Sequence, residues 1–132
     1  MGRRLIVDTN LLIAYERGAL DRAAFDEDEI ALAAVSIAEY RLGIELADTA
    51  ERAAARSRSL AAIVAVVDVL DYTGTTAVHH TRLLAHVRRQ GRARSAHDMI
   101  IAAHAAETGR TVVSLDAKAR FAGLPGVLAV EP

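Results

Sequence analysis

Four acidic side chains share one position relative to the expected elements: each lies where an apolar, strand-like run or a loop passes into a helix. They are Asp8, Glu39, Asp98 and Asp116. In a parallel α/β sheet, such junctions lie along the carboxyl edge of the strands, where ligands bind. The pattern therefore predicts that four carboxylates, far apart in the sequence, meet at one place.

A cluster of four carboxylates is expected to bind a metal ion. Carboxylates within a few ångströms raise one another's pKa, and a cation relieves the repulsion. Oxygen ligands without Cys or His favour Mg²⁺, with Mn²⁺ as the second choice. Because such an ion can activate a water and neutralise a phosphoryl transition state, the expected chemistry is phosphodiester hydrolysis.

Each acid also has a simpler explanation as a helix cap. Asp8 could cap the helix that follows it, and Asp116 could cap a turn beginning at Ala117. Two further pairs have capping-box spacing: Ser36 with Glu39, and Ser95 with Asp98. Capping favours acids near helix starts, but it does not require all of them to lie at one edge of a sheet.

Short apolar runs alternate with longer helical patterns along the chain. Strands are expected at residues 5–7, 30–35, 67–70, 111–115 and 127–130. Helices are expected from residue 11, in two segments of 36–66 divided near residue 48, from 75 or 76 to 90, and from 95 to 108. The last two helices stop at Gly91 and Gly109. This alternation predicts an α/β fold: one domain over residues 1–132, with a central, mostly parallel sheet of about five strands flanked by helices on both faces.

The composition excludes several classes of protein. With 132 residues and 52% hydrophobic residues, the chain can bury one core. It has no Cys, which excludes disulfides, thiolate nucleophiles and zinc–thiolate sites. No apolar run is long enough to span a membrane, so a cytoplasmic protein is expected. The absence of P-loop, GxGxxG and GxSxG motifs removes support for nucleotide-driven motors, dinucleotide enzymes and α/β-hydrolases.

Basic residues gather in a segment without acids, between Thr73 and His97, although the net charge is −1. They are Arg82, Arg88, Arg89, Arg92 and Arg94. Such a segment is most simply a solvated helix and loop, but next to Asp98 it is also a candidate to bind an RNA backbone. Aromatic residues make up 4% and Trp is absent, so recognition would depend on phosphates and RNA shape.

The histidines are expected to have surface or structural roles. Those on shared helical faces, His79 with His86 and His97 with His104, lack the i, i+4 spacing of a metal-ligand pair. His97 adjoins Asp98 and could touch a substrate. Adjacent helical residues point in different directions, however, which argues against both facing one site.

Four strings resemble the successive motifs of PIN-domain ribonucleases, in particular the VapC-type toxins of bacterial toxin–antitoxin pairs. They are LIVDTN (5–10), SIAEYRLGI (36–44), HDMIIAAHA (97–105) and VVSLDAKARFAGLPGV (112–127). Each motif alone is weak, but the four occur in the family's order over nearly the whole chain.

The resemblance implies a set of site residues. The catalytic acids would be Asp8, Glu39, Asp98 and Asp116, with the metal held by Asp8, Asp98 and Asp116, or by Glu39 in place of the last. Polar neighbours would be Thr9, Asn10 and Ser114. Ser114 stands where Thr is more usual, and keeps the hydroxyl. Lys118 lies where the family commonly has a second polar or acidic residue, which leaves open whether one or two ions bind.

The implied function is a Mg²⁺-dependent endoribonuclease, the toxin of a type II toxin–antitoxin pair, which hydrolyses RNA and inhibits translation or growth. A cognate antitoxin protein would block the acidic pocket, and a homodimer would assemble with it. Two alternatives stay open. A receiver- or phosphatase-like phosphotransfer domain would use Asp8, but the DTN string lacks the second Asp of a DxD phosphatase and a receiver would not need Glu39. A non-catalytic PIN-like domain that binds RNA or protein would be expected to lack some of the acids.

Overall fold

Five parallel strands form the central sheet of this protein. The structure, a computed structural model, describes residues 2–116 and 119–132. The strands are β1 (Arg4–Val7), β2 (Glu29–Ala33), β3 (Asp68–Leu70), β4 (Thr111–Val113) and β5 (Leu128–Val130). They lie in the order β3-β2-β1-β4-β5, and every pairing is parallel. The predicted sheet is confirmed.

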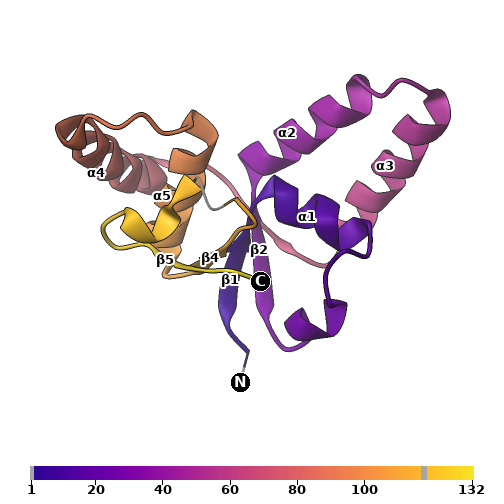
Figure 1. The fold of residues 1–132 in the computed structure, drawn as a ribbon, viewed down its shortest axis with the longest axis horizontal. Helices are drawn as coiled ribbons and strands as arrows, with labels where there is room; N and C mark the ends of the chain where they lie inside the picture. Colours follow the sequence, from indigo (N-terminus) through magenta and orange to yellow (C-terminus); the bar gives the residue numbers. More distant parts are fainter. Residues whose placement is uncertain (1, 117–118) are drawn as a thin grey trace.

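Helices cover both faces of the sheet. They are α1 (Thr9–Glu16), α2 (Ala34–Glu45), α3 (Ala50–Val64), α4 (Gly74–Gln90) and α5 (Ala96–Thr108), with short 3₁₀ turns η1 (Arg22–Phe25) and η3 (Phe121–Gly123). Figure 1 shows α1, α2 and α3 on one side of the strands and α4 and α5 on the other. Within the described part of the chain, no helix is long and apolar enough to cross a membrane.

The central strand β1 is buried on both faces. Leu5 and Val7 pack with α1 residues such as Leu11, whereas Ile6 packs with α5 residues such as Ile101. Successive side chains of a strand point to opposite faces, so a strand covered on both sides must be apolar at every position. This burial explains why residues 5–7 of β1 form a continuous apolar run rather than an alternating one.

The strand order creates a crevice at the carboxyl ends of β1 and β4. From β1 the chain passes through α1 to β2 on one side, while β4 pairs with β1 on the other side. Connections that leave neighbouring strands in opposite directions open a ligand crevice between them. Asp8 follows β1 and Ser114 follows β4, so both residues lie at this point.

One predicted helix start is wrong. The helix expected from Ser36 begins at Ala34, and its N-cap is Ala33, which has no side-chain capping bond. The preceding strand accordingly ends at Ala33 rather than at residue 35. Because the chain turns from β2 directly into the helix, Ser36 lies within the first turn and is fully buried. Ser36 and Glu39 therefore do not form a capping box.

Two of the other predicted caps, Asp8 and Ser95, are present. Oδ1 of Asp8 accepts from the Leu11 backbone N–H at 2.9 Å and caps α1. Oγ of Ser95 accepts from the Asp98 backbone N–H at 3.2 Å and caps α5. Helices α4 and α5 end at Gly91 and Gly109, whose φ angles of 68° and 67° are left-handed and suit glycine.

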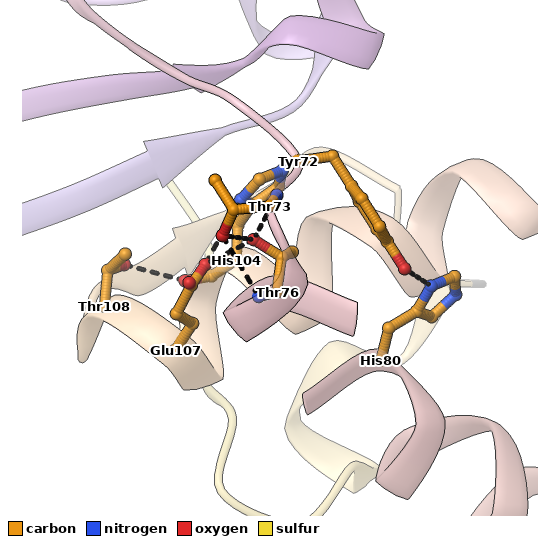
Figure 2. A network of polar contacts seen from close by, with 7 residues as sticks. All are labelled: Tyr72, Thr73, Thr76, His80, His104, Glu107 and Thr108. Carbon is orange, nitrogen blue, oxygen red and sulfur yellow. Dashed lines mark hydrogen bonds and ion pairs between the residues drawn. The ribbon is translucent and has the colours of Figure 1, made fainter. Parts of the chain in front are cut away.

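A polar network joins the start of α4 to the end of α5 (Figure 2), whereas Asp98 lies in the first turn of α5, at its other end. Thr73 and Thr76 form a capping box, and the Thr76 hydroxyl donates to Glu107 Oε1 at 2.8 Å. His104 is 1% exposed, and its Nδ1 has no hydrogen-bond partner and lies 3.8 Å from Glu107 Oε1. Burial holds the pKa of His104 below its usual value, against the opposing charges of Glu107 and Asp71. This histidine is structural, as the sequence predicted for the histidines as a group.

Candidate active site

Asp8 is held at the bottom of the crevice by two donors. The side chain is 5% exposed. Its Oδ1 accepts from the Leu11 backbone, as described, and its Oδ2 accepts a short hydrogen bond from the Ser114 hydroxyl. Two fixed donors leave the carboxylate one orientation in the folded protein. Capping and a role in the site are therefore compatible for this residue.

Ser114 links Asp8 to Asp116. While its hydroxyl donates to Asp8, the same oxygen accepts from the Asp116 backbone N–H at 3.0 Å. Ser114 is nearly buried just after β4. The Ser114 hydroxyl thus fixes both the Asp8 carboxylate and the backbone of Asp116.

Asp98 lies in the first turn of α5 and faces the other acids. Burial raises its pKa, and the charge of Asp116 adds to this effect. Asp8 and Glu39 raise the pKa of Asp98 further, while His97 lowers it. All four acids predicted from the sequence line one pocket, together with Thr9, Asn10, Ser95 and His97. The geometry therefore brings the predicted acids together.

Glu39 reaches the pocket in company with His97. Glu39 lies in the second turn of α2 rather than the first, and its Oε2 is 2.9 Å from His97 Nδ1. On the other side of the ring, His97 Nε2 lies 3.4 Å from Ser36 Oγ. His97 thus bridges α5 and α2. This role was not predicted from the sequence, because adjacent helical residues such as His97 and Asp98 were expected to point in different directions. Both line the pocket, where His97 contacts Glu39 of α2. Apart from this adjacency, the sequence held no signal for His97.

The five arginines of the acid-free segment do not share one environment. Exposed side chains on α4 and the loop after it are Arg82, Arg88, Arg89 and Arg92. Arg94 instead is partly buried, and its Nη1 donates to the carbonyls of Ala119 at 2.6 Å and Arg120 at 2.8 Å. Arg94 thus differs from the other four arginines, because its guanidinium is engaged with carbonyls of the chain itself.

The pocket fits a hard divalent cation by its donor chemistry. Burial raises the pKa of Asp98, and the charges of Asp116, Asp8 and Glu39 add to this effect; such repulsion between carboxylates favours a bound cation. The buried Oγ1 of Thr9, in the same pocket, has no hydrogen-bond partner and suits a water of the ion's shell. Among the described residues, no three acid or histidine side chains stand close enough to hold an ion without adjusting. Ala117 and Lys118 lie outside the described residues. The predicted cap by Asp116 of a turn beginning at Ala117 and the role of Lys118 in the number of bound ions therefore stay predictions.

Comparison with known proteins identifies the family. The model of the PIN domain matches residues 5–124. Ribonuclease VapC5 of Mycobacterium tuberculosis is 33% identical over 126 residues, 96% of this chain and 91% of that protein. A tRNA(fMet)-specific endonuclease VapC of Shigella flexneri is 28% identical over 115 residues, 84% of this chain and 85% of that protein.

A solved structure agrees with these matches. The crystal structure of VapBC-5 from Mycobacterium tuberculosis, a member of the VapBC family of toxin–antitoxin systems, has a TM-score of 0.82 and 28% identity to this chain. It covers 98% of each chain. The matches do not favour a receiver- or phosphatase-like domain. With a family model matched over most of its length and a VapC relative one-third identical to it, the chain belongs to the PIN-domain family, in its VapC branch.

Proposed function

We propose that this protein is a metal-dependent endoribonuclease, the toxin of a type II toxin–antitoxin pair. The observation that carries the proposal is the single pocket lined by Asp8, Glu39, Asp98 and Asp116. The names of the VapC relatives, ribonuclease and endonuclease, support it. RNA as the substrate implies action in the cytoplasm.

The metal ligands in this proposal are Asp8, Asp98 and Asp116, and the ion is Mg²⁺, with Mn²⁺ as a substitute. When bound, the ion supplies an activated water and stabilises charge on the leaving oxygen. The protein's own part is to position these groups. Ser114 orients Asp8 and the backbone of Asp116.

Three further residues complete the proposed site. His97 holds Glu39 at the pocket. There the Glu39 carboxylate can accept a proton from the water that attacks the phosphodiester. Thr9 and Asn10 follow Asp8 and line the same pocket. The buried Thr9 hydroxyl can orient a water, and the exposed Asn10 can contact a phosphate oxygen of the substrate.

The exposed arginines would bind the RNA backbone. Arg88, Arg89 and Arg92 lie at the end of α4 and in the loop that leads to α5, the helix that carries Asp98. Arg82 lies two turns earlier on α4. Guanidinium groups suit phosphate contacts, and with few aromatic residues available these contacts would supply most of the affinity.

The proposed protein partner is a cognate antitoxin. The solved VapBC-5 structure is of a toxin–antitoxin system and matches this chain almost from end to end. The resemblance to VapC-type toxins further implies that the antitoxin would cover the acidic pocket and assemble with a homodimer of this chain. The experiment below therefore uses protein freed of any antitoxin.

The test is cleavage of an RNA pool by the purified chain with Mg²⁺, with Mn²⁺ and with EDTA. Both ions should support cleavage, EDTA should abolish it, and excess Mg²⁺ should restore it. Asp98→Asn should lower the rate about 100-fold or more, the scale lost with a key electrostatic group. The matched control is Asp26→Asn, an exposed aspartate outside the pocket, which should cleave normally. Full activity of Asp98→Asn at saturating Mg²⁺, or phosphorylation of Asp8 by a small phosphodonor without RNA cleavage, would contradict the proposal.

A further inference from the structure

Arg94 connects the two segments that carry Asp98 and Asp116. It immediately precedes Ser95, the N-cap of α5, and Asp98 lies in the first turn of that helix. Its guanidinium reaches the segment after Asp116 and donates to two successive carbonyls, of Ala119 and Arg120. Both hydrogen bonds come from Nη1 of Arg94, so these carbonyls hold the guanidinium in place.

Ala119 transmits this contact to Asp116. Its carbonyl accepts from Arg94, while its backbone N–H donates to the Asp116 carbonyl at 3.2 Å. A small pocket beside the site is lined by Arg94, Asp98, Asp116 and Ala119, among others. Arg94 therefore lines the same small pocket as the two acids, and it is bonded to the backbone that leads to one of them.

The segment that Arg94 holds has a backbone conformation that needs support. Arg120 has a φ of 45°, and among the described residues it is the one non-glycine with a positive φ. A non-glycine in this region costs on the order of 1 kcal/mol or more and persists only where its surroundings fix it. Two anchors do so here: Arg94 on the carbonyl side, and Phe121, which is buried in the core.

We propose that Arg94 is a positioning residue of the site: its guanidinium fixes residues 119–120, and through them Asp116, against the helix start that carries Asp98. The inference rests on the proposed metal-dependent activity. In this role Arg94 sets the distance between two proposed metal ligands, Asp98 and Asp116, instead of contacting RNA. Removing the guanidinium should widen that separation and weaken metal binding.

The test is Mg²⁺ binding to purified, antitoxin-free protein, measured by calorimetric titration and by the Mg²⁺-induced rise in melting temperature. Arg94→Ala should raise the Mg²⁺ dissociation constant about tenfold or more, as is typical when a group that orients metal ligands is lost. Arg94→Lys, which keeps a cation with several donors, should recover part of the affinity. The matched control is Arg92→Ala, which removes an exposed arginine two residues away and should leave the Mg²⁺ dissociation constant unchanged.

A second variant perturbs the same contact without removing the charge. A Cβ added at Gly123 would lie 3.3 Å from Arg94 Nη2, so Gly123→Ala must displace the guanidinium slightly and should also weaken Mg²⁺ binding. This variant carries the test if Arg94→Ala does not fold. Melting in EDTA measures the stability of each variant without metal. A variant that melts like wild type in EDTA but binds Mg²⁺ more weakly shows that Arg94 positions the metal ligands.

The outcomes separate this inference from the proposed function. Wild-type protein that binds Mg²⁺ and cleaves RNA, with Mg²⁺ affinity unchanged in both the Arg94 and the Gly123 variants, overturns the positioning role alone. An equal loss in Arg94→Ala and Arg92→Ala also overturns it, because the effect would then be one of net charge. Wild-type protein that neither binds Mg²⁺ nor cleaves RNA overturns both.

Discussion

Replacing Ser114 with Ala removes one hydroxyl that serves two residues of the site. The hydroxyl donates to the buried Asp8 carboxylate and accepts from the Asp116 backbone N–H. A hydrogen bond to a charged group contributes about 1.5 to 3 kcal/mol, and a neutral one about 1 kcal/mol. The partly exposed Asp116 N–H can bond to water instead, so the loss in metal-free protein should be close to the first contribution alone, about 2 kcal/mol.

This loss can be measured as a change in melting temperature. For a domain of 132 residues, the unfolding entropy is roughly 0.28 kcal/mol/K, so Ser114→Ala should melt about 7 °C lower than wild type. The assay is thermal unfolding in EDTA followed by circular dichroism. Ser114→Thr is the matched control: it keeps the hydroxyl and should lose much less stability.

A double-mutant cycle with Asp8→Asn isolates the contact. If the hydroxyl acts through the Asp8 carboxylate, the two changes together should destabilise less than the sum of their separate effects. An unchanged melting temperature in Ser114→Ala would refute the reasoning. Equal losses in the Ala and Thr variants would refute it too, since the effect would then come from packing.

Three other predictions concern charge. In EDTA at pH 7, Asp98→Asn should melt at a higher temperature than wild type, because burial and the neighbouring acids hold the pKa of Asp98 above its usual value and disfavour the ionised form. The gain should shrink as the pH falls, because the folded wild-type protein takes up a proton on Asp98 before the unfolded chain does. Acidification below pH ~6.5 should lower the free energy of unfolding, by at most about 1.4 kcal/mol per pH unit for one proton. The reason is that burial holds the pKa of His104 below its usual value, so only the unfolded chain readily binds that proton. His104→Gln should flatten this dependence of the unfolding free energy on pH in urea titrations. On a catalytically inactive background, Arg88→Ala should flatten the plot of log RNA affinity against log salt by about 0.7. If the slope is unchanged in this variant and in the Ala variants of Arg82, Arg89 and Arg92, the exposed arginines have no role in RNA binding.

The sheet and the meeting of the acids were predictable from the sequence because each depends on local signals and one topological rule. The buried residues 5–7 of strand β1 are all apolar and are followed directly by an acid, and parallel strands bring their carboxyl ends to one edge. The start of α2 was not predictable in this way. Ser36 and Glu39 have the spacing of a capping box, but whether Ser36 begins the helix or lies buried inside it is decided by where β2 stops.

Arg94 and His97 show a different limit. The sequence reveals the charge of Arg94 but not the position of its partners, the carbonyls of Ala119 and Arg120, which the fold brings to it from 25 and 26 residues away. His97 is likewise defined by Glu39 on another helix. Side chains that act between elements carry little local signal, because their neighbours are set by the tertiary structure.

The position of β1 in the middle of the sheet has a consequence for synthesis of the protein. Its first neighbour, β2, is translated soon after it, but its second neighbour, β4, is separated from it by α1 to α5, and Ser114 lies 106 residues beyond Asp8. At about 5 to 20 residues per second, the ribosome needs on the order of 10 s to cover that interval. A nascent chain therefore carries Asp8 without its hydroxyl donor and without Asp116. The acid pocket assembles only when nearly all of this sequence has been translated, so a growing chain that has not yet reached Ser114 and Asp116 lacks a complete pocket.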